Sequence, residues 1–485
     1  MVLSKNRANL LAAAVLVCAC ISPITSSGEI KLPLLGDTTS GVVSLQQEHE
    51  LGRAWLQMFR SRVATLNDAQ LKDYLEQLVK RLASHSELND RRLELITINN
   101  PTINAFAVPG GVIGVHTGLF MYAENEGQLA SVLSHEIAHL SQRHFARQVA
   151  NQKANSFTSM AGLLAGLVLA ATVGGDAGLA AMTASQAAAV DNTLRFSRQN
   201  EQEADRHGLE TLYRAGMDPA SAAGMFDRML AATRYTGHRP PEFLLTHPLT
   251  EKRVSDMRSR LGKYPKKHYP ENVAYFLMRA RALMAIDNNP QRSLKRFKSE
   301  LEGHSQSPEG ARYGLALAQS AAGLHDAART TLQPLLDKDP QRLTYQLAAV
   351  TIDREAERFT PALARLNALA ADYPDSYPLQ SELAETLLRA NRYGESEKVL
   401  EALARQRPTD PDIWYQLAET SGLAGDIPGV HTARAEYFIL TGVYDKARQQ
   451  LGYARKLVAQ DFRRSAIIQQ RLRDLDKMES NARKL

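Results

Sequence analysis

The stretch that decides the fold is GQLASVLSHEIAHLSQRHFARQ, residues 127–148. Its apolar residues recur at three- and four-residue spacing, which predicts one amphipathic helix that begins near residue 124. The predicted buried positions include Leu129, Val132, Leu133 and Leu140. On another part of this helix His135 and His139 lie one turn apart, and Glu136 directly follows the first histidine. Two imidazoles at this spacing can share a metal ion, and the glutamate is placed to act on a water beside it.

A catalytic zinc ion typically takes three protein ligands and a water, so the motif needs one more ligand. The metzincin continuation would require Gly at position 142 and His at position 145. The chain has Gln142 and Phe145 instead, which excludes that class. His144 lies five residues after His139, and a continuous helix would turn it away from the ligand face. We therefore expect His144 to be an ordinary exposed histidine.

The best downstream source of a third ligand is FSRQNEQEADRHG, residues 196–208. Glu201 and Asp205 stand four residues apart, on one face of a predicted helix. Glu201 would complete a His-His-Glu site, and Asp205 would orient a ligating histidine from behind. Glu203 lies on another side and is predicted to be a solvated charge, whereas His207 remains an alternative ligand.

A third polar segment, LLTHPLTEKR, covers residues 244–253. Pro248 favours an extended backbone at His247, and a helix is predicted to start at Thr250. His247 could donate a hydrogen bond to the transition state or serve as a fourth ligand that displaces water. A purely structural histidine is the third interpretation, and the residues alone leave all three open.

The region before the histidine helix is predicted to contain two helices and a small sheet. Residues 45–84 have helical periodicity with a break near Asn67-Asp68, and the segments 93–98 and 104–120 have the character of short strands. The run from Asn104 to Val108 is a candidate edge strand that an unfolded substrate could join by main-chain pairing. The Asn104 side chain could hydrogen-bond that substrate.

The uncharged segment FTSMAGLLAGLVLAATV, residues 157–173, resembles a membrane span in composition. A single crossing would place His135 and Glu201 on opposite sides of a bilayer, and residues 177–190 are too polar and too short to return. We therefore expect an Ala/Gly-rich hairpin, buried or lid-like, over the site.

After a charged linker at 263–267, a 34-residue period predicts tetratricopeptide repeats, in which stacked helix pairs bury their small and apolar positions. Further helices are expected at 273–285, 291–301 and 433–459. The positions that repeat are the pairs Leu315-Ala316, Ala349-Val350, Leu383-Ala384 and Leu417-Ala418, the prolines Pro340, Pro374 and Pro408, and the small residues Ala328, Ala362 and Ser396.

The composition of the 485 residues, 44% hydrophobic and 23% charged, excludes a disordered chain. A net charge of +6 is small for this length and argues against a nucleic-acid partner. Cys18 and Cys20 are the two cysteines of the sequence, so any metal must be held by histidines and carboxylates. Both lie in residues 1–27, which have the basic, apolar and small-residue regions of a signal peptide. An anchor helix and lipid attachment at Cys20 are the less favoured alternatives to a cleaved signal.

The segments HEIAHLSQRH (135–144), EQEAD (201–205), GGVIGVHTGL (110–119) and THPLTEKR (246–253) resemble the gluzincin peptidases that include the HtpX heat-shock protease and the CAAX prenyl proteases. The resemblance covers roughly residues 45–262, and the export signal with the repeats is similar to the periplasmic branch of that family. It implies one Zn²⁺ per chain held by His135, His139 and Glu201. It further implies Glu136 as general base, Asp205 in support and His247 near the metal.

The expected fold is mainly α-helical. A signal peptide (1–27) precedes a zincin-like α+β metalloprotease domain with a small sheet (28–265), and a repeat solenoid follows (266–485). The resemblance implies a periplasmic zinc endopeptidase that promotes assembly of outer-membrane β-barrel proteins and degrades misfolded ones. Expected partners are those barrels and, through the repeats, the barrel assembly machinery, with peripheral outer-membrane association. The alternative is a mainly non-proteolytic repeat scaffold with a latent metal site.

Overall fold

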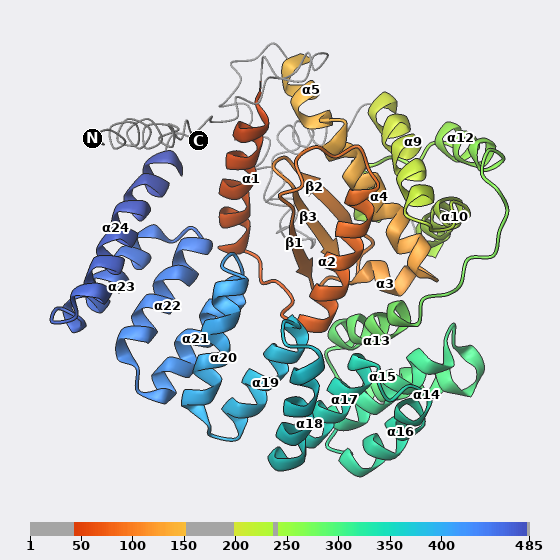
Figure 1. Ribbon diagram of the computed structural model, residues 1–485. Helices are drawn as coiled ribbons and strands as arrows, with labels where there is room; N and C mark the ends of the chain where they lie inside the picture. Colours follow the sequence, from red (N-terminus) through yellow and green to blue (C-terminus); the bar gives the residue numbers. More distant parts are fainter. Residues whose placement is uncertain (1–42, 152–197, 236–240, 483–485) are drawn as a thin grey trace, which may run out of the picture.

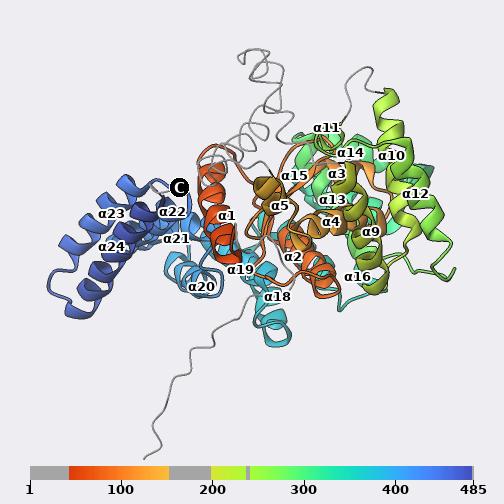
Figure 2. The same cartoon turned by 90° about the horizontal axis from the view of Figure 1, so that it is seen from above.

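The computed structural model describes residues 43–151, 198–235 and 241–482 (Figures 1 and 2). The predicted signal peptide, Cys18, Cys20 and the predicted hairpin at 157–190 lie outside these residues. Within the described ranges no helix has both the length and the apolar character needed to cross a bilayer. Helices dominate, and a small three-stranded sheet lies among those of the N-terminal body, which we define as residues 43–261 (Figure 1).

The body begins with two amphipathic helices, α1 (Leu45–Arg60) and α2 (Ala69–Ser84). Ser44 and Gln47 form a capping box at the start of α1. The predicted break near Asn67-Asp68 is confirmed, because Asp68 caps α2 by accepting the Leu71 N–H. Both helices bury their apolar faces toward the sheet, and α2 also packs on α4.

The sheet contains β1 (Glu94–Ile98), β2 (Ala105–Val108) and β3 (Val112–His116) in the order β1-β3-β2. Strand β1 is parallel to β3, and β2 is antiparallel to β3 with Phe106 opposite Gly114. The turn between β2 and β3 requires glycine, because Gly110 and Gly111 have φ values of +81° and +82°. Because β2 pairs only with β3 in the described sheet, it is an edge strand, as predicted for the run from Asn104 to Val108.

The sheet leads through α3 (Gly118–Tyr122) to α4 (Glu126–Ser141), which carries both histidines of the motif. The prediction of one helix through Gln148 is wrong. Arg143 has a left-handed backbone with φ +50°, and a separate helix α5 (His144–Asn151) follows. The Arg143 side chain is held by Glu48, with Nε 3.2 Å from Oε2, and by the Val43 carbonyl.

Helix α9 (Arg198–Arg214) packs along α4. The approach is close, since a Cβ on Gly208 would lie 3.1 Å from the His135 backbone nitrogen. Helix α10 (Ala220–Tyr235) packs on α4, and α12 (Glu251–Leu261) contacts both α9 and α10. The short α11 (Glu242–Thr246) ends at His247. These helices enclose the motif histidines from the side opposite the sheet.

The repeat array, which we define as residues 273–482, is a succession of antiparallel helices. Its small repeating residues Ala328, Ala362 and Ser396 are completely buried, as the 34-residue period predicts. The predicted helical segment 433–459 belongs to two helices, which are separated by a turn at Gly442, where φ is +72°. The helices are α13 (Val273–Asp287), α14 (Pro290–Ser299) with a π-helical turn (Glu300–His304), α15 (Pro308–Ala321), α16 (His325–Lys338), α17 (Leu343–Glu355), α18 (Phe359–Asp372), α19 (Tyr377–Arg389), α20 (Tyr393–Gln406), α21 (Pro411–Ala424), α22 (Ile427–Leu440), α23 (Tyr444–Leu457) and α24 (Phe462–Ala482).

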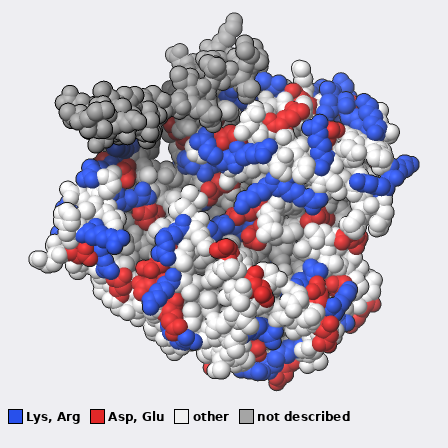
Figure 3. All heavy atoms as spheres, viewed as in Figure 1, with Lys and Arg blue, Asp and Glu red and all other residues white. Residues whose placement is uncertain are grey.

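The array curves around one side of the body, from α13 beside α3 to α22 beside α1 (Figure 1). Arg281 pairs with Asp68 at 2.8 Å, and Lys72 with Asp410 at 2.6 Å. Gln57 accepts a hydrogen bond of 2.6 Å from the Tyr444 hydroxyl. One apolar core continues from α2 through α13 to α17, so the repeats share a core with the body across the predicted domain boundary. Charges of both signs are interspersed over the visible face of both parts (Figure 3).

Candidate metal centre

Four buried side chains from three segments converge on one point. His135 and His139 come from α4, Glu201 from α9 and His247 from the end of α11. Each offers one donor atom, and these atoms all lie within 4.8 Å of one another. The Nε2 atoms of His135 and His139 are 3.0 Å apart, and His247 Nδ1 is 3.0 Å from Glu201 Oε1. Folding thus brings together the three predicted ligands and the histidine whose role was left open.

The donor set fits a divalent metal ion. Three imidazole nitrogens and one carboxylate oxygen that point at a common centre are a set that zinc commonly takes in tetrahedral sites. Burial of so many polar groups without a compensating charge is costly, and a cation at their centre would satisfy all four. These residues would hold such an ion.

Glu136 lies beside this cluster and is 1% exposed. Its Oε1 atom is 3.6 Å from His247 Nε2, and the backbone N–H of Ala107 in β2 hydrogen-bonds the carboxylate. Burial raises the pKa of Glu136 above its ordinary value. In the described part of the chain Glu136 Oε1 is buried without a hydrogen-bond partner.

The Nδ1 atom of His135, which is not the nitrogen in the donor cluster, contacts a carboxylate. Asp205 Oδ1 lies 3.0 Å from His135 Nδ1, as the position of Asp205 four residues after Glu201 predicts. Burial alone would lower the pKa of His135, but its hydrogen bonds with Asp205 and Glu201 raise that pKa to about 9. Asp205 therefore lies where it can fix the orientation of this ring.

Arg253 belongs to the same buried cluster, although no sequence motif identifies it. Its guanidinium makes two 2.7 Å hydrogen bonds to Asp205, and its Nη1 lies 2.8 Å from Glu201 Oε2. From the sequence, Arg253 is expected only to lie near the start of the helix predicted at Thr250. Two carboxylates, Glu201 and Asp205, predicted in one buried site require a nearby cation, and this requirement could have identified Arg253.

The prediction of an exposed His144 is wrong, and Glu203, predicted to be a solvated charge, is only partly exposed. His144 is completely buried, and its Nδ1 lies 2.7 Å from His139 Nδ1. This is possible because the helix is interrupted at Arg143, and α5 turns back toward the cluster. Its Nε2 is 3.3 Å from Glu203 Oε2, and Glu203 also pairs with Arg147, so Glu203 is not simply solvated. Burial, followed by the charge of Arg147, lowers the pKa of His144 to about 4.

Two other predicted positions lie outside the cluster. His207 pairs with Glu87 at 3.2 Å, with a third of its side chain exposed. Asn104 precedes β2, and its Nδ2 lies 3.4 Å from Glu242 Oε2 at the start of α11. Asn104 is therefore near the segment that carries His247 and does not touch the metal-binding atoms.

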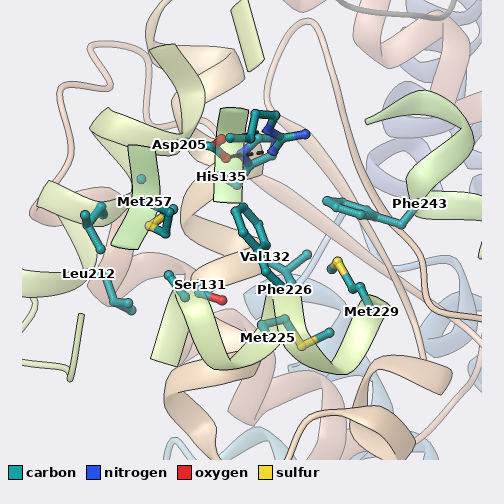
Figure 4. A pocket seen from close by; sticks show the side chains of 14 residues that line it. Ser131, Val132, His135, Asp205, Leu212, Met225, Phe226, Met229, Phe243 and Met257 are labelled. Carbon is teal, nitrogen blue, oxygen red and sulfur yellow. Dashed lines mark hydrogen bonds and ion pairs between the residues drawn. The ribbon is translucent and has the colours of Figure 1, made fainter. Parts of the chain in front are cut away.

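A small apolar pocket lies behind His135, between α4, α9, α10 and α12 (Figure 4). His135 and Asp205 form its polar end, and Met225, Met229 and Phe243 line its apolar part. The Arg253 guanidinium lies 5.5 Å from the centre of the Phe226 ring in the same wall. This packing keeps the hydrogen bonds among His135, Asp205 and Arg253 away from bulk water and so strengthens them.

Comparison with known proteins covers both parts of the chain. The model of peptidase family M48 matches residues 69–261, and a tetratricopeptide repeat model matches residues 354–419. The β-barrel assembly-enhancing protease of Escherichia coli K12 is 32% identical over 453 residues, which cover 93% of this chain and 92% of that protein. The putative β-barrel assembly-enhancing protease of Vibrio cholerae is 31% identical, over 91% of this chain and 93% of that protein.

A further similarity covers a smaller share of the chain. The mitochondrial metalloendopeptidase OMA1 of Schizosaccharomyces pombe is 34% identical over 181 residues, 37% of this chain and 50% of that protein. The buried His/Glu cluster, the family model and relatives that match nearly the whole length agree with one another. The chain therefore belongs to peptidase family M48, in the group of β-barrel assembly-enhancing proteases, and is a metallopeptidase.

Proposed function

We propose that this chain is a periplasmic zinc endopeptidase that cleaves misfolded or stalled outer-membrane β-barrel proteins and promotes the assembly of others. The observation that carries the proposal is the buried convergence of His135, His139 and Glu201, with Glu136 at its edge. The nitrogen and oxygen donors favour zinc, one ion per chain. The names of the E. coli and V. cholerae relatives support the substrate class.

Zinc held by these residues would polarise a scissile carbonyl and acidify a water. Glu136 takes the proton of the attacking water and delivers it to the leaving amine, a role that suits a buried carboxylate whose pKa is raised. Asp205, fixed by Arg253, holds His135 in the tautomer whose Nε2 faces the centre. His247 steadies the developing oxyanion or, when it occupies a fourth ligand position, closes the site.

Strand β2 supplies the substrate-binding edge in this proposal. The Asn104 carbonyl accepts the His116 N–H of β3, so the alternate residues Ala105 and Ala107 direct their backbone groups away from β3. The Ala107 N–H already reaches Glu136. An extended substrate segment that pairs beside β2 would therefore pass along the catalytic carboxylate, with Asn104 available to hydrogen-bond it. Unfolded barrel strands have the required extended form.

The repeat array is proposed to recruit partners. Stacked helix pairs present extended surfaces for protein segments, and the barrel assembly machinery is the partner that the relatives' names suggest. We further propose export by residues 1–27, peripheral association with the outer membrane, and division into a protease domain (28–265) and a repeat domain (266–485). Chaperone-like quality control would then combine repeat binding with cleavage in the body.

The test compares wild-type protein with Glu136→Gln on an unfolded β-barrel protein while bound zinc is measured. We expect cleavage to fall about 10²- to 10⁴-fold with zinc content unchanged. Glu210→Gln serves as the matched control, because Glu210 is a partly exposed residue of α9 that pairs with Arg214 outside the cluster. Equal cleavage by wild type and Glu136→Gln would remove the mechanism.

A second candidate function, an assembly scaffold with a latent metal site, is favoured by one observation. His247 supplies a fourth protein donor, and four protein ligands are typical of closed, structural zinc sites. The two functions separate in cells that lack this protein. Restoration of barrel assembly by Glu136→Gln to the wild-type level would favour the scaffold, and restoration only by cleavage-competent protein would favour the peptidase.

A further inference from the structure

We propose that His144 is a positioning residue for the metal ligand His139, within a hydrogen-bonded chain that continues to Glu203 and Arg147. This inference rests on the proposed metal function, because it concerns the support of a ligand in the same site. The chain uses other residues than the Asp205–Arg253 support of His135, and His144 and Arg147 come from a further helix, α5.

The proton positions follow from the metal-facing atom of His139. Its Nε2 belongs to the donor cluster, 3.0 Å from His135 Nε2 and 3.5 Å from Glu201 Oε1. A neutral imidazole that binds a metal through Nε2 carries its proton on Nδ1. That Nδ1–H lies 2.7 Å from His144 Nδ1, which must then be the acceptor.

The same reasoning fixes the next bond. When His144 accepts at Nδ1, its own proton lies on Nε2, which is 3.3 Å from Glu203 Oε2. Glu203 in turn accepts from both terminal nitrogens of Arg147. Each donor from His139 to Glu203 therefore meets an acceptor, and the direction of the chain is compatible with metal bound at His139 Nε2.

The local backbone explains why His144 can reach His139. In a continuous helix, residue 144 would point away from residue 139. The left-handed Arg143 interrupts the helix, and Glu48 and the Val43 carbonyl hold the Arg143 side chain from the start of the body. An arginine with φ near +50° is unfavourable by about 1 kcal/mol, so surrounding contacts must maintain it. The bend places a completely buried imidazole directly behind a ligand.

The groups that contact the Nδ1 atoms of His135 and His139 differ in charge. His135 faces the carboxylate of Asp205 directly, whereas His139 faces an imidazole that stands between it and the Glu203 carboxylate. Supports of this kind orient the ligand ring and increase its donor strength, and their loss typically weakens metal binding 10- to 100-fold. The effect at His139 should fall within this range.

Two substitutions of nearly equal size test the role. Asn places an acceptor oxygen close to the position of His144 Nδ1, whereas Leu fills a similar volume without one. In the full-length chain, we expect His144→Leu to raise the zinc dissociation constant, measured against a chelating dye, about 10- to 100-fold. His144→Asn should recover most of that affinity. His207→Leu is the control, because His207 lies outside the cluster on α9.

The metal-free proteins are compared by thermal unfolding in parallel. A merely space-filling role predicts that Leu and Asn change zinc affinity equally, and that result would overturn the proposal, as would wild-type affinity in His144→Leu.

If His144→Leu does not fold, Glu203→Leu tests the same chain at a partly exposed residue, with a smaller loss expected. Unchanged affinity there would also count against it. Wild-type protein that fails to bind zinc would refute the proposed function itself, whereas normal zinc and cleavage in the Leu variant would refute only the role of His144.

Discussion

The metal centre and the repeat array are stabilised in opposite ways. In the centre, charged and polar side chains are almost completely buried, and each has a particular partner: Asp205 has Arg253, and His139 has His144. In the array, small residues such as Ala362 recur every 34 residues, and many ion pairs are exposed. Loss of Arg253 would therefore leave uncompensated buried charges in the centre, whereas the array distributes its stability over similar neighbours.

The contrast is tested most strongly at Arg253. In Arg253→Met the carboxylates of Asp205 and Glu201 lose a buried cation, which should reduce the free energy of unfolding by about 3–5 kcal/mol. Urea denaturation of the metal-free protein measures this loss. Arg258→Met is the matched control on α12, because the Arg258–Asp227 pair is more than half exposed. An unchanged midpoint for Arg253→Met would contradict the importance of the buried pairing.

The array should respond less strongly to a change in its core. Ala362→Leu forces a larger side chain into a completely buried position of α18 and should cost about 1–3 kcal/mol. Ala364→Leu, at an exposed position of the same helix, should cost little. Circular dichroism during denaturation measures both, and peptidase activity of Ala362→Leu on a short peptide should remain. Loss of that activity with Ala362→Leu would show that the array controls the centre.

The smallest effect is expected where the two regions meet. Lys72→Met removes the 2.6 Å pair with the buried Asp410 and should reduce the free energy of unfolding by about 1–2 kcal/mol. Glu395→Gln, in an exposed pair with Arg392, should have no measurable effect. Limited proteolysis provides a second measurement, with faster cleavage expected for Lys72→Met. Identical stability and cleavage patterns in the two variants would show that this contact does not hold the array to the body.

The same contact should be sensitive to acid. Burial alone would raise the pKa of Asp410, but Lys72, together with Arg407 and Arg60, more than offsets the effect of burial and holds that pKa below its ordinary value. A carboxylate of this kind stabilises the folded state above its unfolded pKa, and the contribution is lost as pH falls through the folded pKa. Wild type should therefore lose more stability than Lys72→Met when denaturation is repeated at successively lower pH. A parallel loss in both proteins would assign the acid sensitivity to other groups.

Local patterns predicted much of this molecule. The spacing of His135 and His139, the pairing of Glu201 with Asp205 and the 34-residue period are regularities that a single stretch of sequence contains. The errors have a common cause. A left-handed arginine at 143 is not expected from its residue type, and the break there moves His144 from the surface into the site.

The omission of Arg253 arose differently. It meets Asp205 across 48 residues, and no periodicity records which helix will lie against which. The continuity of the core across the predicted boundary at 265 has the same origin, because α13 packs on α2 and α3 only after the chain has turned. Contacts of this kind depend on tertiary packing, and a pattern within one segment does not specify them.

We propose that His135, His139, Glu201 and His247 form one zinc site. X-ray absorption spectroscopy on the purified full-length protein, together with its metal content, tests this most directly. We expect one zinc per chain with nitrogen and oxygen ligands near 2.0–2.1 Å and no sulfur, and loss of that zinc in a His139→Ala, Glu201→Ala double variant. Zinc that persists in the double variant, or a sulfur-containing coordination shell in the wild type, would contradict the claim.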